Sequence, residues 1–239
     1  MKAIGFKQSL PITENNSFIQ FETEKPTPGG FDLLVKISAI SVNPVDFKIR
    51  GNAAKDTILD TPKIIGWDAV GIVEAVGDKT SRFNVGDEVY YAGDITRSGS
   101  NAEYQLIDER IVGRKPKNLT ESEAAAIPLT GLTAYEALFD RIRVNPETDK
   151  GKTVLILAGA GGVGSIAIQL AKKLGNLTVI ATASREDSAQ WCKDMGADYV
   201  INHYNDIKEE LAKIGHPEVN YILDFVDLEG YWETAAEII

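Results

Sequence analysis

Short apolar runs separated by turn signals fill the first half of the chain. Turn-forming pairs such as Asn43-Pro44 and Gly86-Asp87 lie between the runs. Six runs rich in Val, Ile, Phe and Tyr predict β-strands, at residues 1–6, 18–22, 32–42, 69–76, 87–92 and 102–107. This pattern predicts a compact β barrel or sandwich, which we assign to residues 1–125.

From about residue 120 the periodicity changes to helices that alternate with strands. Thr120 and Glu123 form a capping box at the start of one helix, and a second helical stretch covers about residues 133–141. Beyond them the sequence predicts strands at 153–158, 177–183, 198–201 and 220–226, and helices at 165–174, 186–195 and 207–214. Such alternation predicts βαβ units, so we expect residues 126–239 to form an α/β domain with a doubly wound parallel sheet.

The predicted parallel sheet is smaller than that of a complete dinucleotide-binding domain. A sheet of this class usually has about six strands, whereas only the four strands above are predicted here. The last residues, 234–239, end inside an amphipathic helical pattern. We therefore expect the C-terminal part of the second domain to be missing from this chain.

Composition and charge narrow the function classes. The 239 residues are 44% hydrophobic and 25% charged, as in a soluble globular protein. The net charge of −10 disfavours nucleic acid and anionic membranes as partners. No run approaches the length of a membrane span, and the single cysteine, Cys192, excludes an internal disulfide framework. We expect a cytoplasmic protein whose partner is a small molecule.

A glycine-rich loop after the first strand of the second domain carries the clearest chemical signal. Gly159, Gly161 and Gly164 satisfy G-x-G-x-x-G, with Gly162 and Val163 between the last two. In this context the glycines allow a tight turn, close approach of a pyrophosphate, and close packing of helix on strand. The N-terminus of the helix then offers free N–H groups to the phosphates. The loop predicts a dinucleotide site.

The end of the second strand of that domain indicates which dinucleotide binds. A site for NAD commonly places an acidic residue there, to hold the ribose 2′-hydroxyl. This chain has Ser184 and Arg185, and its first carboxylate is Glu186. A hydroxyl and a guanidinium suit a 2′-phosphate, so NADPH is the predicted cofactor. The alternative is that Ser184 caps the next helix together with Asp187.

Several segments in fixed order resemble one enzyme superfamily. GWDAVGIVEAVG, FNVGDEVY, PLTGLTAYEAL and AGAGGVGSIAIQLAK together are similar to the medium-chain dehydrogenase/reductases. The branch with the greatest likeness is that of the zinc-independent quinone oxidoreductases, which includes proteins labelled zinc-type alcohol dehydrogenase-like. The resemblance implies a GroES-like barrel domain, a Rossmann domain, an active cleft between them, and a homodimer at full length.

The resemblance also bears on the metal. Zinc alcohol dehydrogenases of this superfamily carry a cysteine ligand near the position of Asn43 and a histidine ligand in a G-H-E segment. This chain has Gly66-Trp67-Asp68 in place of that segment, and tryptophan cannot bind zinc. We expect no zinc site. Trp67 is predicted to be a packing residue, with stacking against substrate as the alternative.

Four further residues are candidates by their place in the family pattern. Asn43 could donate a hydrogen bond to the substrate oxygen, or be only a turn residue before proline. Tyr91 could donate a proton or line the pocket, or be an ordinary strand aromatic. Thr130 corresponds to a position at the nicotinamide end, and His203 to one near the adenosine phosphate. His203 could equally be a polar residue at a strand edge.

Two other features concern the cofactor prediction and a structural ion pair. Ser188 stands where many relatives have a lysine for the 2′-phosphate, so Arg185 would have to compensate. Asp46 and Arg50 are spaced to form an ion pair on a short helix.

The predicted reaction is hydride transfer from NADPH to a quinone or an α,β-unsaturated carbonyl. Without a Lewis acid, oxidation of an ordinary alcohol is difficult, whereas a conjugated acceptor needs only hydrogen bonds to stabilise its developing charge. Two alternatives stay open: a non-catalytic NADPH-binding structural or redox-sensing protein, and an enoyl reductase with a narrower substrate range.

Overall fold

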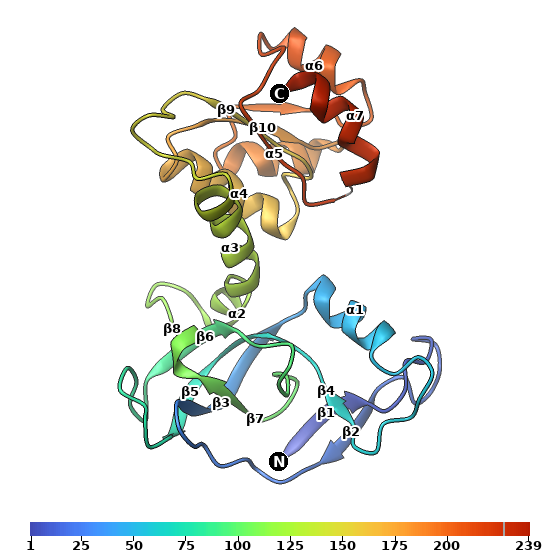
Figure 1. The fold of residues 1–239 in the computed structure, drawn as a ribbon, viewed down its shortest axis with the longest axis vertical. Helices are drawn as coiled ribbons and strands as arrows, with labels where there is room; N and C mark the ends of the chain where they lie inside the picture. The colour runs from blue at the N-terminus through green and yellow to red at the C-terminus, as the bar shows by residue number, and fades with distance from the viewer. Residues whose placement is uncertain (227) are drawn as a thin grey trace. The chain divides into compact units, whose positions relative to one another are not determined.

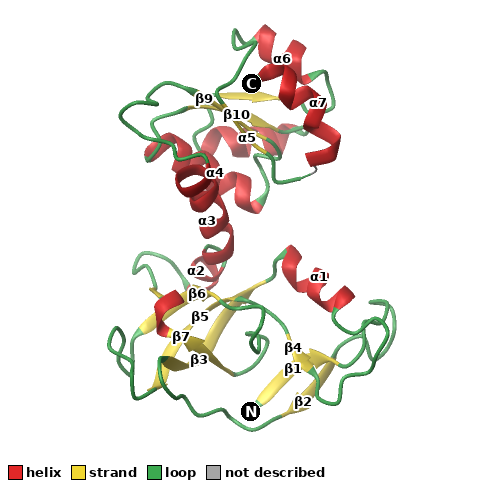
Figure 2. Cartoon of the chain, in the orientation of Figure 1, coloured by secondary structure: helices red, strands yellow, loops and turns green. Residues whose placement is uncertain are grey.

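The computed structural model describes residues 1–226 and 228–239. They form two compact units, Met1–Leu129 and Thr130–Ile239. Strands dominate the first unit, and helices alternate with strands in the second (Figures 1 and 2). Within this described part, no helix is long and apolar enough to cross a membrane.

The first unit is built from two antiparallel sheets. Its strands are β1 (Lys2–Phe6), β2 (Ile19–Glu22), β3 (Asp32–Ser41), β4 (Lys63–Ile64), β5 (Asp68–Val76), β6 (Glu88–Ala92), β7 (Tyr104–Asp108) and β8 (Gly113–Arg114). They are ordered β2-β1-β4 and β7-β3-β5-β6-β8. The short helices are α1 (Pro44–Asn52), the 3₁₀ helix η1 (Glu109–Ile111) and α2 (Glu121–Ala125).

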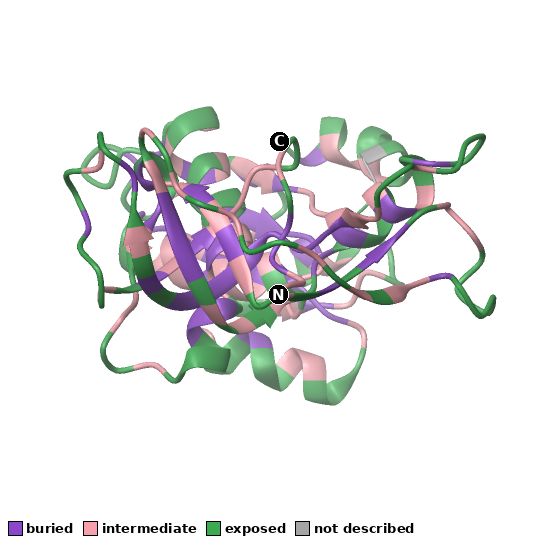
Figure 3. Ribbon diagram, turned by 90° about the horizontal axis from the view of Figure 1, so that it is seen from below, coloured by how far each residue is buried: buried purple, intermediate pink, exposed green. Residues whose placement is uncertain are grey.

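Alternating side chains from the long strands form the core of this unit. Leu33 and Val35 of β3 pack with Val73 of β5, and with Val89 and Tyr91 of β6. These inward positions are buried, and buried residues concentrate along the strands (Figure 3). The six predicted strands are all present, so this half of the pattern is confirmed.

The ion pair predicted on α1 is wrong. Asp46 accepts the backbone N–H of Asn43, whereas Arg50 donates to the carbonyls of Leu10 and Ser17. Asp46 lies in the first turn of α1 and Arg50 in its last turn, and both side chains are buried. Each side chain is therefore bonded to backbone groups nearby and not to the other. Helical spacing alone did not reveal those partners.

The second unit contains a four-stranded parallel sheet in the order β11-β10-β9-β12. Its strands are β9 (Thr153–Ile156), β10 (Thr178–Thr182), β11 (Tyr199–Ile201) and β12 (Tyr221–Leu223). Its helices are α4 (Gly162–Lys173), α5 (Glu186–Asp194), α6 (Ile207–Lys213) and α7 (Leu228–Ile238). The predicted α/β fold class is confirmed.

Helices cover both faces of this sheet. Val154 and Ile156 of β9 belong to one core cluster, and Leu155 and Leu157 belong to a second, because successive side chains point to opposite faces. β9 is accordingly buried along its whole length. This explains why its sequence is a continuous apolar run rather than an alternating one.

The predicted helix at 133–141 consists of two different elements. Helix α3 runs from Pro128 to Tyr135, and a π-helical segment, η2, follows at Glu136–Arg141. Pro128 is well suited to a first helical turn, where the missing N–H needs no partner.

Candidate functional site

The loop between β9 and α4 has the geometry of a phosphate cradle. Gly161 is the N-cap of α4, and both Gly161 and Gly162 are exposed, whereas Gly159 and Gly164 are buried. A Cβ on Gly164 would lie 2.8 Å from the carbonyl oxygen of Gly159, and one on Gly159 would lie 2.7 Å from Cβ of Ala181. The buried glycines are required for close packing, and the exposed ones leave backbone open to a ligand.

Thr182, at the end of β10, fixes the conformation of this loop. Its Oγ1 accepts the N–H of Ala158 at 2.9 Å, and its carbonyl accepts the N–H of Gly159 at 3.0 Å. The loop closes on itself through a 2.9 Å hydrogen bond from Gly161 N–H to the carbonyl of Ala158. Ala158 has φ +53°, a conformation that costs energy for a residue with a side chain. The strand ends therefore hold the cradle in place before any ligand binds.

The start of α4 supplies donors for an anion. The N–H groups in the first turn of a helix have no intrahelical partner, and the helix dipole is positive at that end. Thr130 lies beside the first turn of α4, because a Cβ added to Gly162 would be 3.3 Å from Cγ2 of Thr130. The residues present thus fit the pyrophosphate of a dinucleotide, and the structure brings Thr130, Gly161, Gly162 and Val163 to one end of α4.

Ser184 and Arg185 lie just beyond β10, separated from its last residue, Thr182, by Ala183. Arg185 is the N-cap of α5, so the alternative in which Ser184 caps this helix is wrong. The helix begins one residue later than that alternative requires. Arg185 is exposed, and its Nη2 donates to Oγ of Ser188 at 3.3 Å. A guanidinium and two hydroxyls therefore lie beside the strand end where a 2′-phosphate would be expected.

His203 lies two residues beyond the end of β11. Its ring packs on that of Tyr204, with the centroids 4.7 Å apart. Within the described residues, its buried Nδ1 has no hydrogen-bond partner. Tyr204 is 81% exposed. The phenol ring of Tyr204 and the imidazole of His203 therefore lie just beyond β11, the edge strand of the parallel sheet.

A buried polar cluster surrounds Asn43 in the first unit. Asn43 Nδ2 donates to Asp68 Oδ2 at 2.8 Å, and Asn43 N–H donates to Asp46 Oδ2 at 2.6 Å. The other oxygen of Asp68 accepts the N–H of Leu129, in the first turn of α3, at 2.8 Å. All three polar side chains are buried: Asn43 and Asp46 are 6% exposed and Asp68 is 0% exposed.

The electrostatics of this cluster are unusual for carboxylates. Burial raises the pKa of Asp68 to about 6, in opposition to its hydrogen bonds from Asn43 and Leu129, and the charge of Asp46 adds to the increase. Burial also raises the pKa of Asp46. Perturbed acids of this kind are typical of functional sites.

The expectation that Tyr91 donates a proton or lines the pocket is corrected by its surroundings. Tyr91 is 2% exposed and belongs to the core of the first unit. Its hydroxyl donates to Oε1 of Gln105 at 3.0 Å, and burial raises its pKa far above the ordinary value. In β6 this side chain alternates inward, so it is a core residue.

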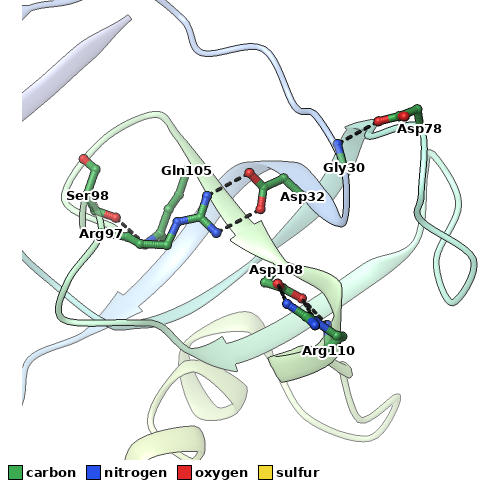
Figure 4. A network of polar contacts seen from close by, with 8 residues as sticks. All are labelled: Gly30, Asp32, Asp78, Arg97, Ser98, Gln105, Asp108 and Arg110. Atoms are coloured by element: carbon green, nitrogen blue, oxygen red, sulfur yellow. Dashed lines mark hydrogen bonds and ion pairs between the residues drawn. The ribbon is translucent and has the colours of Figure 1, made fainter.

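Tyr91 instead helps to anchor the loop that follows β6. Gln105, which accepts from Tyr91, donates its Nε2 to the carbonyl of Ser98 at 2.9 Å (Figure 4). The adjacent Arg97 makes two 2.8 Å hydrogen bonds to the carboxylate of Asp32 (Figure 4). These contacts tie the loop to β3 and β7.

Trp67 also anchors this loop. It is 1% exposed, packs with Phe6, Ala54 and Ile65, and donates Nε1 to the carbonyl of Asp94 at 3.0 Å. The ring fills the place between strand and loop, as the packing interpretation predicted. In the part of the chain that the structure describes, no group of three or more His, Cys, Asp or Glu could hold a metal ion.

Each unit contains a segment that matches a known protein family. Residues 29–117 match the alcohol dehydrogenase GroES-like domain, and residues 162–239 match the zinc-binding dehydrogenase family. A zinc-type alcohol dehydrogenase-like protein of Staphylococcus aureus (strain COL) is 48% identical over 241 residues, which is 100% of this chain and 70% of that protein. The chain belongs to the medium-chain dehydrogenase/reductase superfamily. It is thus an oxidoreductase of that superfamily.

Other members of the superfamily add detail. A 2-methylene-furan-3-one reductase of Solanum lycopersicum is 41% identical over 187 residues, 75% of this chain and 46% of that protein. Among solved structures, a protein of Rhizobium etli CFN 42 assigned as a zinc-dependent alcohol dehydrogenase is 47% identical, with TM-score 0.94 over 100% of this chain and 69% of its own. An Escherichia coli quinone oxidoreductase complexed with NADPH is 27% identical, with TM-score 0.80 over 100% of this chain and 70% of its own.

Two residues of the site were not predicted to be functional from the sequence. Asp68 carried a signal, because it is the only charged side chain in the apolar stretch 64–73. Thr182 carried none, since a threonine at the end of a strand is common. The structure shows its role through its bonds to Ala158 and Gly159.

Proposed function

We propose that this protein is an NADPH-dependent reductase that transfers hydride directly to a quinone or an α,β-unsaturated carbonyl, without a catalytic metal. One observation carries the proposal. Trp67, in the segment where zinc-dependent relatives have a ligand, is buried, and the only polar atom of its side chain is bonded to Asp94. The side chain of Asn43 is bonded to Asp68. The indole of Trp67 and the amide of Asn43 are not ligands that zinc prefers.

The choice of NADPH is supported at the end of β10. Ser184, Arg185 and Ser188 offer hydroxyl and guanidinium donors there, and Glu186 belongs to the following helix. The Escherichia coli quinone oxidoreductase was solved with NADPH, and an Arabidopsis thaliana relative bears the name NADPH-dependent alkenal/one oxidoreductase. The cradle at 159–164 would hold the pyrophosphate, Thr130 the nicotinamide end, and His203 the adenosine end.

The chemistry asked of the protein is modest. Bound NADPH supplies a hydride, and a conjugated acceptor then develops negative charge on its oxygen. Asn43 is the proposed donor to that oxygen, because hydrogen bonds alone can stabilise an enolate or phenolate. With Tyr91 buried in the core, water is the proposed source of the proton.

Three broader expectations accompany this proposal. We propose functional domains at residues 1–125 and 126–239, a cytoplasmic location, and a homodimer for the full-length enzyme. A small-molecule quinone or enone is the proposed partner, and the acidic net charge of −10 argues against nucleic acid.

The first test is a titration of NADPH and NADH, followed by cofactor oxidation with 1,4-benzoquinone or 9,10-phenanthrenequinone, with and without EDTA. We expect tighter binding of NADPH and turnover that EDTA does not change. Loss of turnover with EDTA would contradict the metal-free reaction. Binding of NADPH without turnover of any quinone or enone would favour the non-catalytic NADPH-binding protein.

Substitution of Arg185 tests the cofactor preference. Arg185→Glu removes the guanidinium and adds a like charge beside the 2′-phosphate, so NADPH affinity should fall by roughly tenfold to a hundredfold. NADH affinity should change little. Lys193→Glu, an exposed charge reversal in the last turn of the same helix, is the matched control and should leave both affinities unchanged. Equal losses for NADPH and NADH in Arg185→Glu would contradict the preference.

A further inference from the structure

Two buried carboxylates from different elements hold both donors of Asn43. Asp46, in the first turn of α1, accepts the backbone N–H of Asn43 at 2.6 Å. Asp68, the first residue of β5, accepts its side-chain Nδ2 at 2.8 Å. Asn43 is the N-cap of α1 and forms a capping box with Asp46, so its backbone contact belongs to the start of that helix. The bond from its side chain to Asp68 is more than such a cap requires.

This arrangement is expensive in stability. Asp68 is 0% exposed, and its oxygens are bonded to uncharged donors, Asn43 Nδ2 and Leu129 N–H. Within residues 1–226 and 228–239, the ion pairs include neither Asp46 nor Asp68. A buried charge without an opposite charge disfavours folding. Such a cost is characteristic of residues kept for function.

We propose that Asp68 is a positioning residue that fixes which way the Asn43 amide faces the substrate; the proposal rests on the function proposed above. A carboxylate only accepts hydrogen bonds, so Nδ2 of Asn43 has to point toward Asp68. Oδ1 of Asn43 and its second N–H then have fixed directions. Without Asp68, only the capping contact between the Asn43 side chain and the backbone N–H of Asp46 would orient the amide, and that contact is not a full hydrogen bond.

The acceptor count gives a sharp prediction for Asp68→Asn. Aspartate has two acceptor oxygens, one for Leu129 N–H and one for Asn43, whereas asparagine has a single acceptor. The backbone N–H of Leu129 cannot turn away, so it takes the remaining oxygen. Asn43 would then meet an NH₂ group, and its amide has to rotate by half a turn. The variant keeps size and shape but inverts the amide.

The test is a kinetic cycle with NADPH and 1,4-benzoquinone, using wild type, Asp68→Asn, Asn43→Ala and the double variant. We expect Asp68→Asn to lower kcat by roughly tenfold to a hundredfold while NADPH affinity stays within about twofold. In the Asn43→Ala background, Asp68→Asn should have no further effect on kcat, because its target is gone.

Glu109→Gln is the matched control for this cycle. Glu109 is also a buried carboxylate, 2% exposed, whose oxygens accept from Ser81 and Arg82 N–H far from Asn43 in the sequence. It should leave kcat unchanged. A purely structural role for Asp68, as a cap of α3, would give multiplicative losses in the double variant, and that result would overturn the proposal. Wild-type kcat in Asp68→Asn would overturn it too.

A second measurement decides the geometry if Asp68→Asn does not fold, or if wild type has no turnover. Hydrogen exchange of the side-chain amides in the wild type reports the bond directly, with Asn43 assigned by its absence in Asn43→Ala. We expect Asn43 Nδ2 to exchange at least roughly tenfold more slowly than the exposed Asn16. Exchange as fast as that of Asn16 would overturn the inference. Absent turnover with slow exchange would remove only the proposed function.

Discussion

The glycines of the loop between β9 and α4 have different roles, in packing or in ligand binding. Gly159 and Gly164 are packed against neighbouring backbone and side chains, whereas Gly161 is exposed at the N-cap of α4. A Cβ on Gly161 would lie 3.2 Å from the carbonyl oxygen of Ala158, a tight but tolerable distance. The loop therefore separates residues that the fold needs from one that a ligand needs.

Substitution at these positions should separate stability from binding. Gly161→Ala should fold with a loss below about 1 kcal/mol, yet weaken NADPH binding by roughly tenfold or more, because a methyl group would stand where the pyrophosphate approaches. Gly164→Ala should destabilise the protein by about 1–3 kcal/mol, since its Cβ would overlap backbone oxygens. Urea unfolding and NADPH titration measure the two effects. Normal NADPH affinity in Gly161→Ala would contradict the placement of the phosphate.

At the scale of elements, the local hydrophobic patterns predicted most strands and helices correctly. The strands of the first unit followed alternation, and the parallel strands followed continuous apolar runs, because burial on one face or two leaves those signatures. Helix α4 begins at Gly162 rather than at the predicted residue 165, because glycines in its first turn obscure a helical pattern. The π-helical turn η2 left no signal that helical periodicity could reveal.

The residues of the candidate site also differ in how far local sequence could predict them. The phosphate cradle is contiguous in sequence, so its residues could be predicted together. Asp68 bonds to residues 25 and 61 positions away, a relation that only the folded chain reveals. Tyr91 was misjudged because family position suggested a pocket, whereas the alternation of β6 turns its side chain into the core.

Tyr91 can be tested as a structural element of the loop after β6. Tyr91→Phe removes the donor to Gln105 and leaves a buried acceptor unpaired, which should destabilise the protein by ~1–2 kcal/mol. Turnover should not change, because the hydroxyl is enclosed in the core. Thermal unfolding and quinone reduction measure the two quantities. Loss of turnover at unchanged stability would restore Tyr91 as a catalytic residue.

At the scale of the whole molecule, the two units have separate hydrophobic cores. Clusters around Val154 and Leu155 serve the second unit, and a cluster around Leu33 and Val35 serves the first. Asp68 belongs to the first unit and touches Leu129, the last residue of that unit. Its protonation is thus linked to the unfolding of the first unit.

The pH dependence of stability should reveal the buried charge of Asp68. The folded protein has a pKa of about 6 at this carboxyl, above the ordinary value of 3.8, so it binds the proton more tightly than the unfolded chain does. Asp68 therefore contributes stability that is fully present below about pH 4 and is lost as the pH rises through about 6. The difference corresponds to roughly 3 kcal/mol.

Comparison with Asp68→Asn isolates this contribution, because asparagine does not titrate and the remaining carboxylates are common to both proteins. The free energy of unfolding of wild type minus that of Asp68→Asn should shift in favour of wild type as the pH falls from 7.5 to 5. Urea unfolding at several pH values measures the difference. A difference that is constant over this range would mean that Asp68 titrates normally, and hence that its surroundings admit water. The charge held against Asn43 would then lack the energetic cost that marks it as functional.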